Sequence, residues 1–201
     1  MSSIDPFGIF PPFEAFYIDA MLWHSTSAKQ SIDDVGAWIG LVRANDAKAL
    51  ELPKDQLFER LQNIVIQAAS LSRYLWPSPR KPQEVHTKRA SRLRQGLAVR
   101  DDSALYNRDL RNGLEHFDEK LDLYLMGNIV GKISPIYVAE DEPVSEVPLH
   151  IFKAFYTNPL VFVLLGVRYE METLVSELNR LHASLLDCQR GGYRLPLPAH
   201  A

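Results

Sequence analysis

Three polar side chains with complementary chemistry lie close together in the segment RNGLEH, namely Arg111, Asn112 and His116. A guanidinium is a permanent cation whose planar donors suit phosphate oxygens. An imidazole, with an unperturbed pKa near ~6.5, can take up or release a proton near neutral pH. Together these groups could catalyse attack of an RNA 2′-hydroxyl on the adjacent phosphate without a metal. His116 would be the acid–base group, and Arg111 would stabilise the charge that develops.

One amphipathic helix over residues 106–125 is expected to position these groups. On an ideal helical wheel the apolar side chains fall inside an arc ~100° wide. They are Tyr106, Leu110, Leu114, Phe117, Leu121, Tyr124 and Leu125. The opposite side carries Arg108, Arg111, Asn112, Glu115, His116 and Glu119. Asn112 precedes His116 by four residues on this helix, so it can orient the imidazole ring or donate to a phosphate. The segment Asp101-Asp102-Ser103 is expected to provide an N-cap for this helix.

Arg111-Asn112 followed by His116 resembles the RNxxxH signature of the HEPN family, whose general form is Arg, four to six residues, then His. The resemblance implies an up-and-down helical bundle that forms a homodimer, with the motif helix facing the partner chain. It also implies a metal-independent endoribonuclease without a cofactor, of the kind found in toxin–antitoxin and phage-defence systems. RNA and an antitoxin or other protein partner are then expected. Arg111 would clamp the phosphate, Asn112 would orient the His116 ring, and His116 would transfer protons.

A basic segment surrounds the motif. Between residues 73 and 111 ten Lys or Arg side chains stand against four carboxylates, a local charge of +6. Since the whole chain carries −3, the remainder carries −9. A basic band on an acidic body can steer a polyanion to one place. The residues expected to bind RNA are Arg108, Lys88, Arg89, Arg92 and Arg94, of which Lys88, Arg89 and Arg92 are predicted on the outer face of a helix.

Other interpretations of the motif stay open. Glu115, Asp118 and Glu119 would repel phosphate unless the basic band neutralises them. His116 and Glu119, with Glu115 adjacent, could ligate a divalent metal, but such sites draw ligands from several helices and no matching Glu-x-x-His pair occurs elsewhere. No metal site is therefore predicted. A non-catalytic interaction or nucleic-acid-binding module is the main alternative, in which the polar stripe forms a dimer interface.

The remaining periodicity indicates a mainly α fold, an up-and-down helical bundle with a small β-hairpin before the C-terminal helix. Helical patterns cover one bent helix or two after Phe13, then residues 53–75, 84–99, 106–125 and 170–187, whereas residues 151–156 and 160–165 indicate the hairpin. A further strand near 136–138 would be short at most. We expect a single domain over 1–201, with a bundle core at 13–127 and an extension at 128–190. An irregular arm is expected over 1–12 and a flexible tail after Gly191.

Composition restricts the function classes. With 201 residues the chain can bury one well-formed core. The single cysteine, Cys188, rules out an intramolecular disulfide and is expected to be buried or incidental rather than a nucleophile. The N-terminal sequence lacks the features of a signal peptide, and the longest apolar run, 159–167, is shorter than the ~20 residues that cross a bilayer. We therefore expect a cytoplasmic protein without a membrane partner. The three tryptophans, Trp23, Trp38 and Trp76, are expected in core or helix-end packing.

Overall fold

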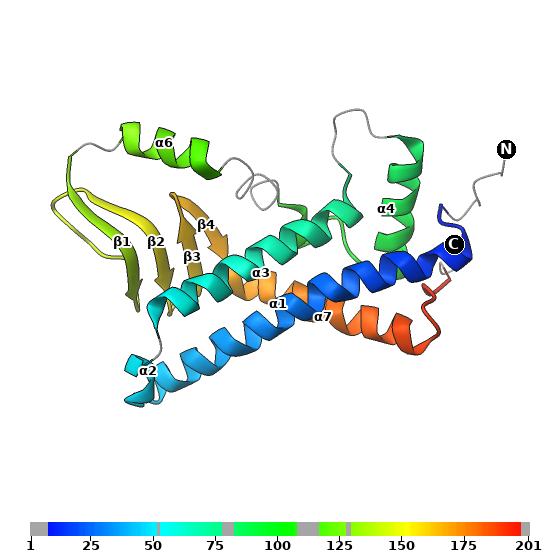
Figure 1. Cartoon of the computed structure of the whole chain (residues 1–201), viewed down its shortest axis with the longest axis horizontal. Coiled ribbons are helices and arrows are strands. Elements are labelled where there is room, and N and C mark those ends of the chain that lie inside the picture. Colours follow the sequence, from blue (N-terminus) through cyan, green and yellow to red (C-terminus); the bar gives the residue numbers. More distant parts are fainter. Residues whose placement is uncertain (1–7, 52, 78–82, 108–116, 128–129, 198–201) are drawn as a thin grey trace.

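Two long helices, α1 (Glu14–Arg43) and α3 (Lys54–Leu75), lie antiparallel along the length of the molecule (Figure 1). The computed structural model describes residues 8–51, 53–77, 83–107, 117–127 and 130–197. A third long helix, α7 (Met171–Arg190), packs against α1. α1 therefore lies between α3 and α7, and the protein is mainly α-helical. A 3₁₀ turn, η1 (Pro11–Phe13), precedes α1, and a single turn, α2 (Lys48–Glu51), separates it from α3.

Helix α3 confirms the prediction from periodicity. Its seven predicted core residues are all buried: Leu57, Leu61, Ile64, Val65, Ala68, Leu71 and Leu75. Pro53 has extended backbone angles and immediately precedes the helix. The helix ends at Leu75 because Trp76 is extended and Pro77 follows, which cannot continue the hydrogen-bonding ladder.

Helix α1 is one continuous element of 30 residues, which settles the choice between one helix and two. Ser31, whose spacing to Asp34 suggested a second helix start, lies inside α1 and is 1% exposed. Its hydroxyl accepts a hydrogen bond from Asn63 of α3 at 2.8 Å. The serine therefore joins two helices rather than capping one.

A four-stranded sheet with the order β1-β2-β3-β4 packs at one end of these helices (Figure 1). Its strands are β1 (Lys132–Ala139), β2 (Leu149–Tyr156), β3 (Val161–Leu164) and β4 (Val167–Glu170). The predicted hairpin is confirmed as the antiparallel pair β2–β3. The prediction missed β4 and the full length of β1, which pairs parallel with β2 from Lys132 opposite Leu149. β1 is an edge strand, which is where a strand tolerates a proline such as Pro135.

The inner face of the sheet shares one buried core with the long helices. Phe155 and Phe162 are fully buried, and their rings lie 6.4 Å from Trp38 of α1 and 6.2 Å from Phe58 of α3, centroid to centroid. The buried cluster also includes Leu178 and other residues of α7. Residues of the segment 128–190 therefore complete the core that α1 and α3 begin.

The region of the predicted central helix differs from the expectation. Helix α4 (Glu84–Gly96) is followed by a 3₁₀ turn, η2 (Ala104–Tyr106), and by Asn107 in an extended conformation. The next described element is α6 (Phe117–Gly127). The prediction that an α-helix begins at Tyr106 is therefore wrong, because Ser103 caps a 3₁₀ turn instead.

Two further expectations are overturned. Trp23 was expected in core or helix-end packing, but it lies inside α1 and is 68% exposed. The tail after Gly191 was expected to be flexible, but Leu195 is 4% exposed and belongs to the buried core. Apolar residue type alone predicts neither outcome, because both depend on which elements pack against those positions.

Candidate functional site

The motif itself, with Arg111, Asn112, His116 and the accompanying Arg108, lies outside the described residues. The structure describes its two flanks. On the N-terminal side η2 ends at Tyr106 and is followed by Asn107, and on the C-terminal side α6 begins at Phe117. The acidic residues Asp118 and Glu119 occupy the first turn of α6.

An aromatic corner forms the N-terminal flank. The rings of Tyr106 and Trp76 lie 5.1 Å apart, centroid to centroid, at an interplanar angle of 42°. The guanidinium carbon of Arg94 lies 5.6 Å from the centroid of the Trp76 ring, a cation–π contact. Trp76 is 8% exposed, whereas Tyr106 is 47% exposed. Sequence reasoning missed this corner because it assigned Tyr106 to the apolar face of a longer helix.

The local sequence explains how Tyr106 is held there. The hydroxyl of Ser103 accepts a hydrogen bond from the Leu105 backbone N–H, and the Tyr106 N–H donates to the Ser103 carbonyl at 2.8 Å. Leu105 is fully buried and anchors the turn. The turn therefore places Leu105 in the core and Tyr106 at the surface.

A cavity of about 410 Å³ adjoins the corner. Its lining includes Tyr106 and Asn107 from the η2 side, and Thr173 and Leu174 from α7. Further lining residues are Asp101, Asp102, Ser103, Ala104, Arg168, Tyr169 and Glu170. Arg168 is paired with Glu142 at 2.8 Å, and this hydrogen bond raises the pKa of its guanidinium. Asp101, Asp102 and Glu170 contribute three carboxylates to the lining of the cavity.

The described members of the basic band make contacts within the chain. Lys88 pairs with Glu84 at 2.6 Å, and its hydrogen bond lowers the pKa of that carboxyl. Arg89 lies 5.9 Å from the ring centroid of Tyr17 and donates to the Arg73 carbonyl. These groups are partly exposed, so local partners compensate some of their charge without removing them from the surface.

Two arginines near the cavity are paired in the same way. Arg94 donates to the Leu75 carbonyl at 2.5 Å and lies 3.5 Å from Asp101. Arg100 pairs with Asp102 at 2.6 Å, and both side chains are largely exposed. The two aspartates of the cavity wall therefore each have a cationic neighbour.

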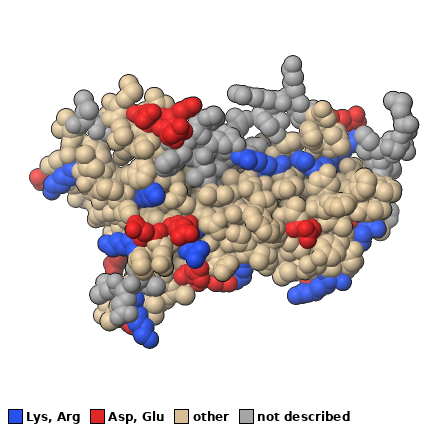
Figure 2. All heavy atoms as spheres, viewed as in Figure 1, with Lys and Arg blue, Asp and Glu red and all other residues tan. Residues whose placement is uncertain are grey.

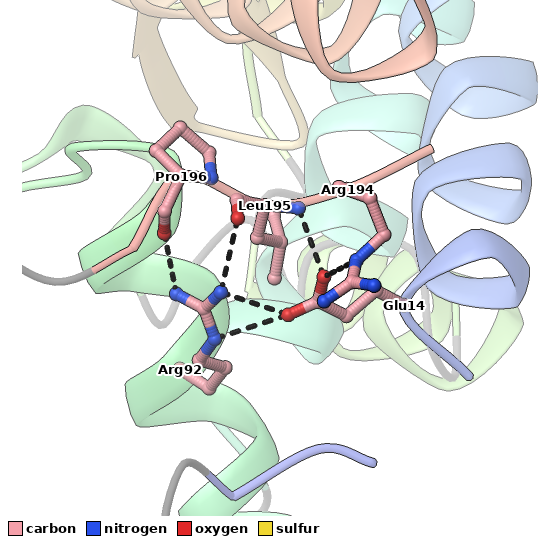
Figure 3. A network of polar contacts seen from close by, with 5 residues as sticks. All are labelled: Glu14, Arg92, Arg194, Leu195 and Pro196. Atoms are coloured by element: carbon pink, nitrogen blue, oxygen red, sulfur yellow. Dashed lines mark hydrogen bonds and ion pairs between the residues drawn. The ribbon is translucent and has the colours of Figure 1, made fainter. Parts of the chain in front are cut away.

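Arg92 corrects the prediction of an outward, RNA-facing side chain. It is 3% exposed and forms a buried ion pair with Glu14, itself 1% exposed (Figure 3). Nε and Nη2 donate to Glu14 Oε1 at 3.2 and 2.8 Å. The other donors reach the carbonyls of Leu195 and Pro196 at 3.1 and 2.8 Å. Glu14 Oε2 accepts from Arg194 Nε and from the Leu195 N–H, both at 3.0 Å.

A polar ladder joins α1 to α3. His24 contacts Gln67 at 2.7 Å, and Gln67 donates to Asn63 at 2.9 Å. Asn63 donates in turn to Ser31 and to Ser27. Polar groups in a helix interface favour the one alignment in which all are satisfied, so this ladder fixes the register of the two helices. The helical spacing of these polar residues is visible in the sequence, but the sequence does not show which of them form hydrogen bonds with one another.

On the opposite side of α1, His182 of α7 contacts the buried Ser25 hydroxyl at 3.0 Å. Burial lowers the pKa of the His182 imidazole below its ordinary value, and the charge of Lys29 acts in the same direction. Asp33 opposes these effects. The neutral imidazole is therefore favoured in the folded protein.

The described residues give little support to metal or thiol chemistry. Among them, no group of three or more His, Cys, Asp or Glu side chains is arranged to hold a metal ion. Cys188 is buried, and burial raises the pKa of its thiol, which disfavours the nucleophilic thiolate.

Comparisons with known proteins supply no family. No protein-family model, no curated protein and no solved structure matches the chain. Within the described ranges, every helix is too short or too polar to cross a membrane.

The first prediction concerns the buried ion pair. Glu14→Gln is expected to lower the free energy of unfolding by about 3–5 kcal/mol, because it leaves the Arg92 guanidinium buried without a counter-charge. Urea denaturation of parent and variant measures the difference. Asp34→Asn is the matched control, since Asp34 pairs with Arg60 at 3.0 Å and the two side chains are 49% and 41% exposed. It should cost less than about 1 kcal/mol. Equal effects of the two substitutions would contradict the prediction.

The second prediction concerns His182 and pH. Because its pKa is lower in the folded than in the unfolded protein, the unfolded state binds the proton first as the pH falls. Stability is therefore expected to decrease below about pH 6.5, the pKa of an unperturbed histidine. Denaturation at several pH values should show a shallower decrease for His182→Gln than for the parent. Identical pH dependences would contradict this assignment.

Proposed function

We propose that this protein is a HEPN-like, metal-independent endoribonuclease that cleaves RNA by attack of a 2′-hydroxyl on the adjacent phosphate. The proposal rests on the sequence Arg111-Asn112-x-x-x-His116, which begins five residues after Tyr106. His116 serves as the acid–base group, Arg111 as the phosphate clamp and Asn112 as the orienting residue. Arg108 makes a secondary phosphate contact.

The described surroundings of the motif support this proposal. The aromatic corner and the adjoining cavity provide an exposed ring and a recess at the residues that precede the motif in the chain, which a nucleic acid chain can use. Lys88, Arg89 and Arg94 keep partly exposed positions from which they can contact phosphates. The ribonuclease proposal includes a homodimer in the cytoplasm and a role as a toxin or phage-defence component held in check by an antitoxin or another protein.

A non-catalytic interaction module is the second candidate, and a row of exposed aromatic side chains favours it. Phe10, Phe13, Phe16 and Trp23 are 55%, 53%, 72% and 68% exposed. Figure 2 shows that the surface over the middle of α1 and α3 is largely free of charged side chains. The rings of Phe10 and Phe13 lie 5.2 Å apart and those of Phe13 and Phe16 lie 6.2 Å apart, centroid to centroid. Exposed apolar groups that lie together are typical of protein interaction sites. In this candidate the aromatic row is the interface with a second copy of the chain.

The third prediction tests the ribonuclease. The purified parent is expected to cleave a mixed RNA in the presence of EDTA, because the mechanism needs no metal. His116→Ala should lose about 10²- to 10⁴-fold in rate, and Arg111→Ala should lose a comparable factor, since it removes charge stabilisation. Gel analysis of labelled RNA measures the rates. Cys188→Ser is a control that should leave the rate unchanged.

An inactive parent preparation, with the oligomer intact and no toxicity on expression, would refute the ribonuclease proposal. Toxicity on expression is measured as well, because an antitoxin that copurifies with the protein would suppress cleavage in the RNA assay. The protein expressed without its antitoxin would still be toxic. Cleavage that persists in both variants would instead assign the activity to other residues or to a contaminant.

The fourth prediction tests the interaction surface. The double variant Phe16→Ser/Trp23→Ser is expected to raise the dissociation constant of a homodimer by at least about 30-fold, because truncated aromatic anchors cost about 2 kcal/mol or more. Sedimentation velocity at several concentrations measures it. Thr26→Ala, an exposed change on the same helix, is the control. An unchanged dimer would remove the aromatic row as the interface.

A further inference from the structure

We infer that Tyr106 is a stacking platform for one base of a single-stranded RNA, an inference that rests on the proposed ribonuclease function. Its ring is 47% exposed although it contacts the buried ring of Trp76. A tyrosine in this state offers a flat apolar surface to an incoming base. Base–aromatic stacking is the recurrent way in which proteins hold unpaired bases.

The platform is held before any ligand arrives. Trp76 supports one side of the Tyr106 ring, and Arg94 lies against Trp76 at 5.6 Å. Arg94 is itself fixed by its hydrogen bond to the Leu75 carbonyl. Tyr106 belongs to a hydrogen-bonded turn anchored by the buried Leu105. Little conformational entropy is therefore lost when a base stacks, which favours binding.

The adjoining cavity suits a base better than a phosphate. Its volume of about 410 Å³ is within the range of small-ligand pockets. Tyr106 and Asn107 line it together, and Glu170 contributes a carboxylate to the same lining. Carboxylates repel phosphate but accept hydrogen bonds from the exocyclic amino groups of bases.

The distance along the chain connects the platform to the proposed catalytic groups. Arg111 lies five positions after Tyr106 in the chain, and five steps of a fully extended chain span at most about 18 Å. A strand whose phosphate is bound by Arg111 can therefore place a nearby base on Tyr106. A duplex cannot, because its bases are paired and stacked on one another. The platform thus selects single-stranded substrate.

The test measures binding separately from cleavage. The probe is a short, fluorescently labelled single-stranded RNA of mixed sequence in which every 2′-hydroxyl is methylated, so that it cannot be cleaved. Fluorescence anisotropy is expected to show that Tyr106→Ala weakens binding by about 5- to 100-fold. Tyr106→Phe should bind within about twofold of the parent, because the ring face is retained. Ile133→Ala is the control, since it removes a 79% exposed apolar side chain from β1, outside the cavity lining.

Two outcomes would overturn the inference. One is parent-like binding by Tyr106→Ala, and the other is equal loss in Tyr106→Ala and Ile133→Ala. Circular dichroism of each variant shows whether a loss reflects unfolding. Parent and Tyr106→Ala should bind a duplex of the same sequence with equal affinity. Weaker binding of the duplex by Tyr106→Ala would also refute the assignment.

Cleavage of unmodified RNA separates this inference from the ribonuclease proposal. If His116→Ala abolishes cleavage while Tyr106→Ala binds and cleaves as the parent does, the enzyme stands and the platform is wrong. If the parent binds RNA through Tyr106 but does not cleave it, the base platform stands and the ribonuclease is wrong.

Discussion

The buried ion pair between Glu14 and Arg92 holds together parts of the chain that are remote in sequence. It joins the first residue of α1 to α4, and through the Leu195 backbone it fixes the C-terminal segment against both (Figure 3). Two desolvated charges are tolerated only because almost every donor and acceptor of the pair is satisfied. The consequence reaches the candidate site, since α4 also carries Arg94, which supports Trp76 and hence Tyr106.

Around this anchor, α1 is the element that organises the rest. Its α3 side presents the polar ladder, its α7 side presents Ser25 to His182, and its sheet side presents Trp38 to Phe155. The apolar contacts supply most of the stabilisation, whereas the polar contacts select one alignment of the helices. The sheet and α7 are thus part of the same core as α1 and α3, and the candidate cavity lies where η2 meets α7.

The two surfaces that carry the functional proposals differ in chemistry. The aromatic row at the start of α1 is apolar and suits a protein partner, whereas the corner at Tyr106 combines one exposed ring with carboxylates of the adjoining cavity and suits a base. The basic band presents less uncompensated positive charge at the surface than the sequence suggests. Its described members already have partners within the chain, and one of them, Arg92, is buried.

The sequence by itself determined the elements whose patterns are local. The 3.6-residue period predicted the helices α3 and α4, and two β-rich runs around Asn158 predicted the β2–β3 hairpin. Only the tertiary structure decided which of similar residues are buried: Arg92 rather than Arg94, and Trp76 rather than Trp23. It also decided that β1 pairs parallel with β2 and that Tyr106 lies in a 3₁₀ turn beside a cavity. The physical reason is range: helical and hairpin patterns arise between neighbours, whereas the partner of Arg92 stands 78 residues away and leaves no periodic signal.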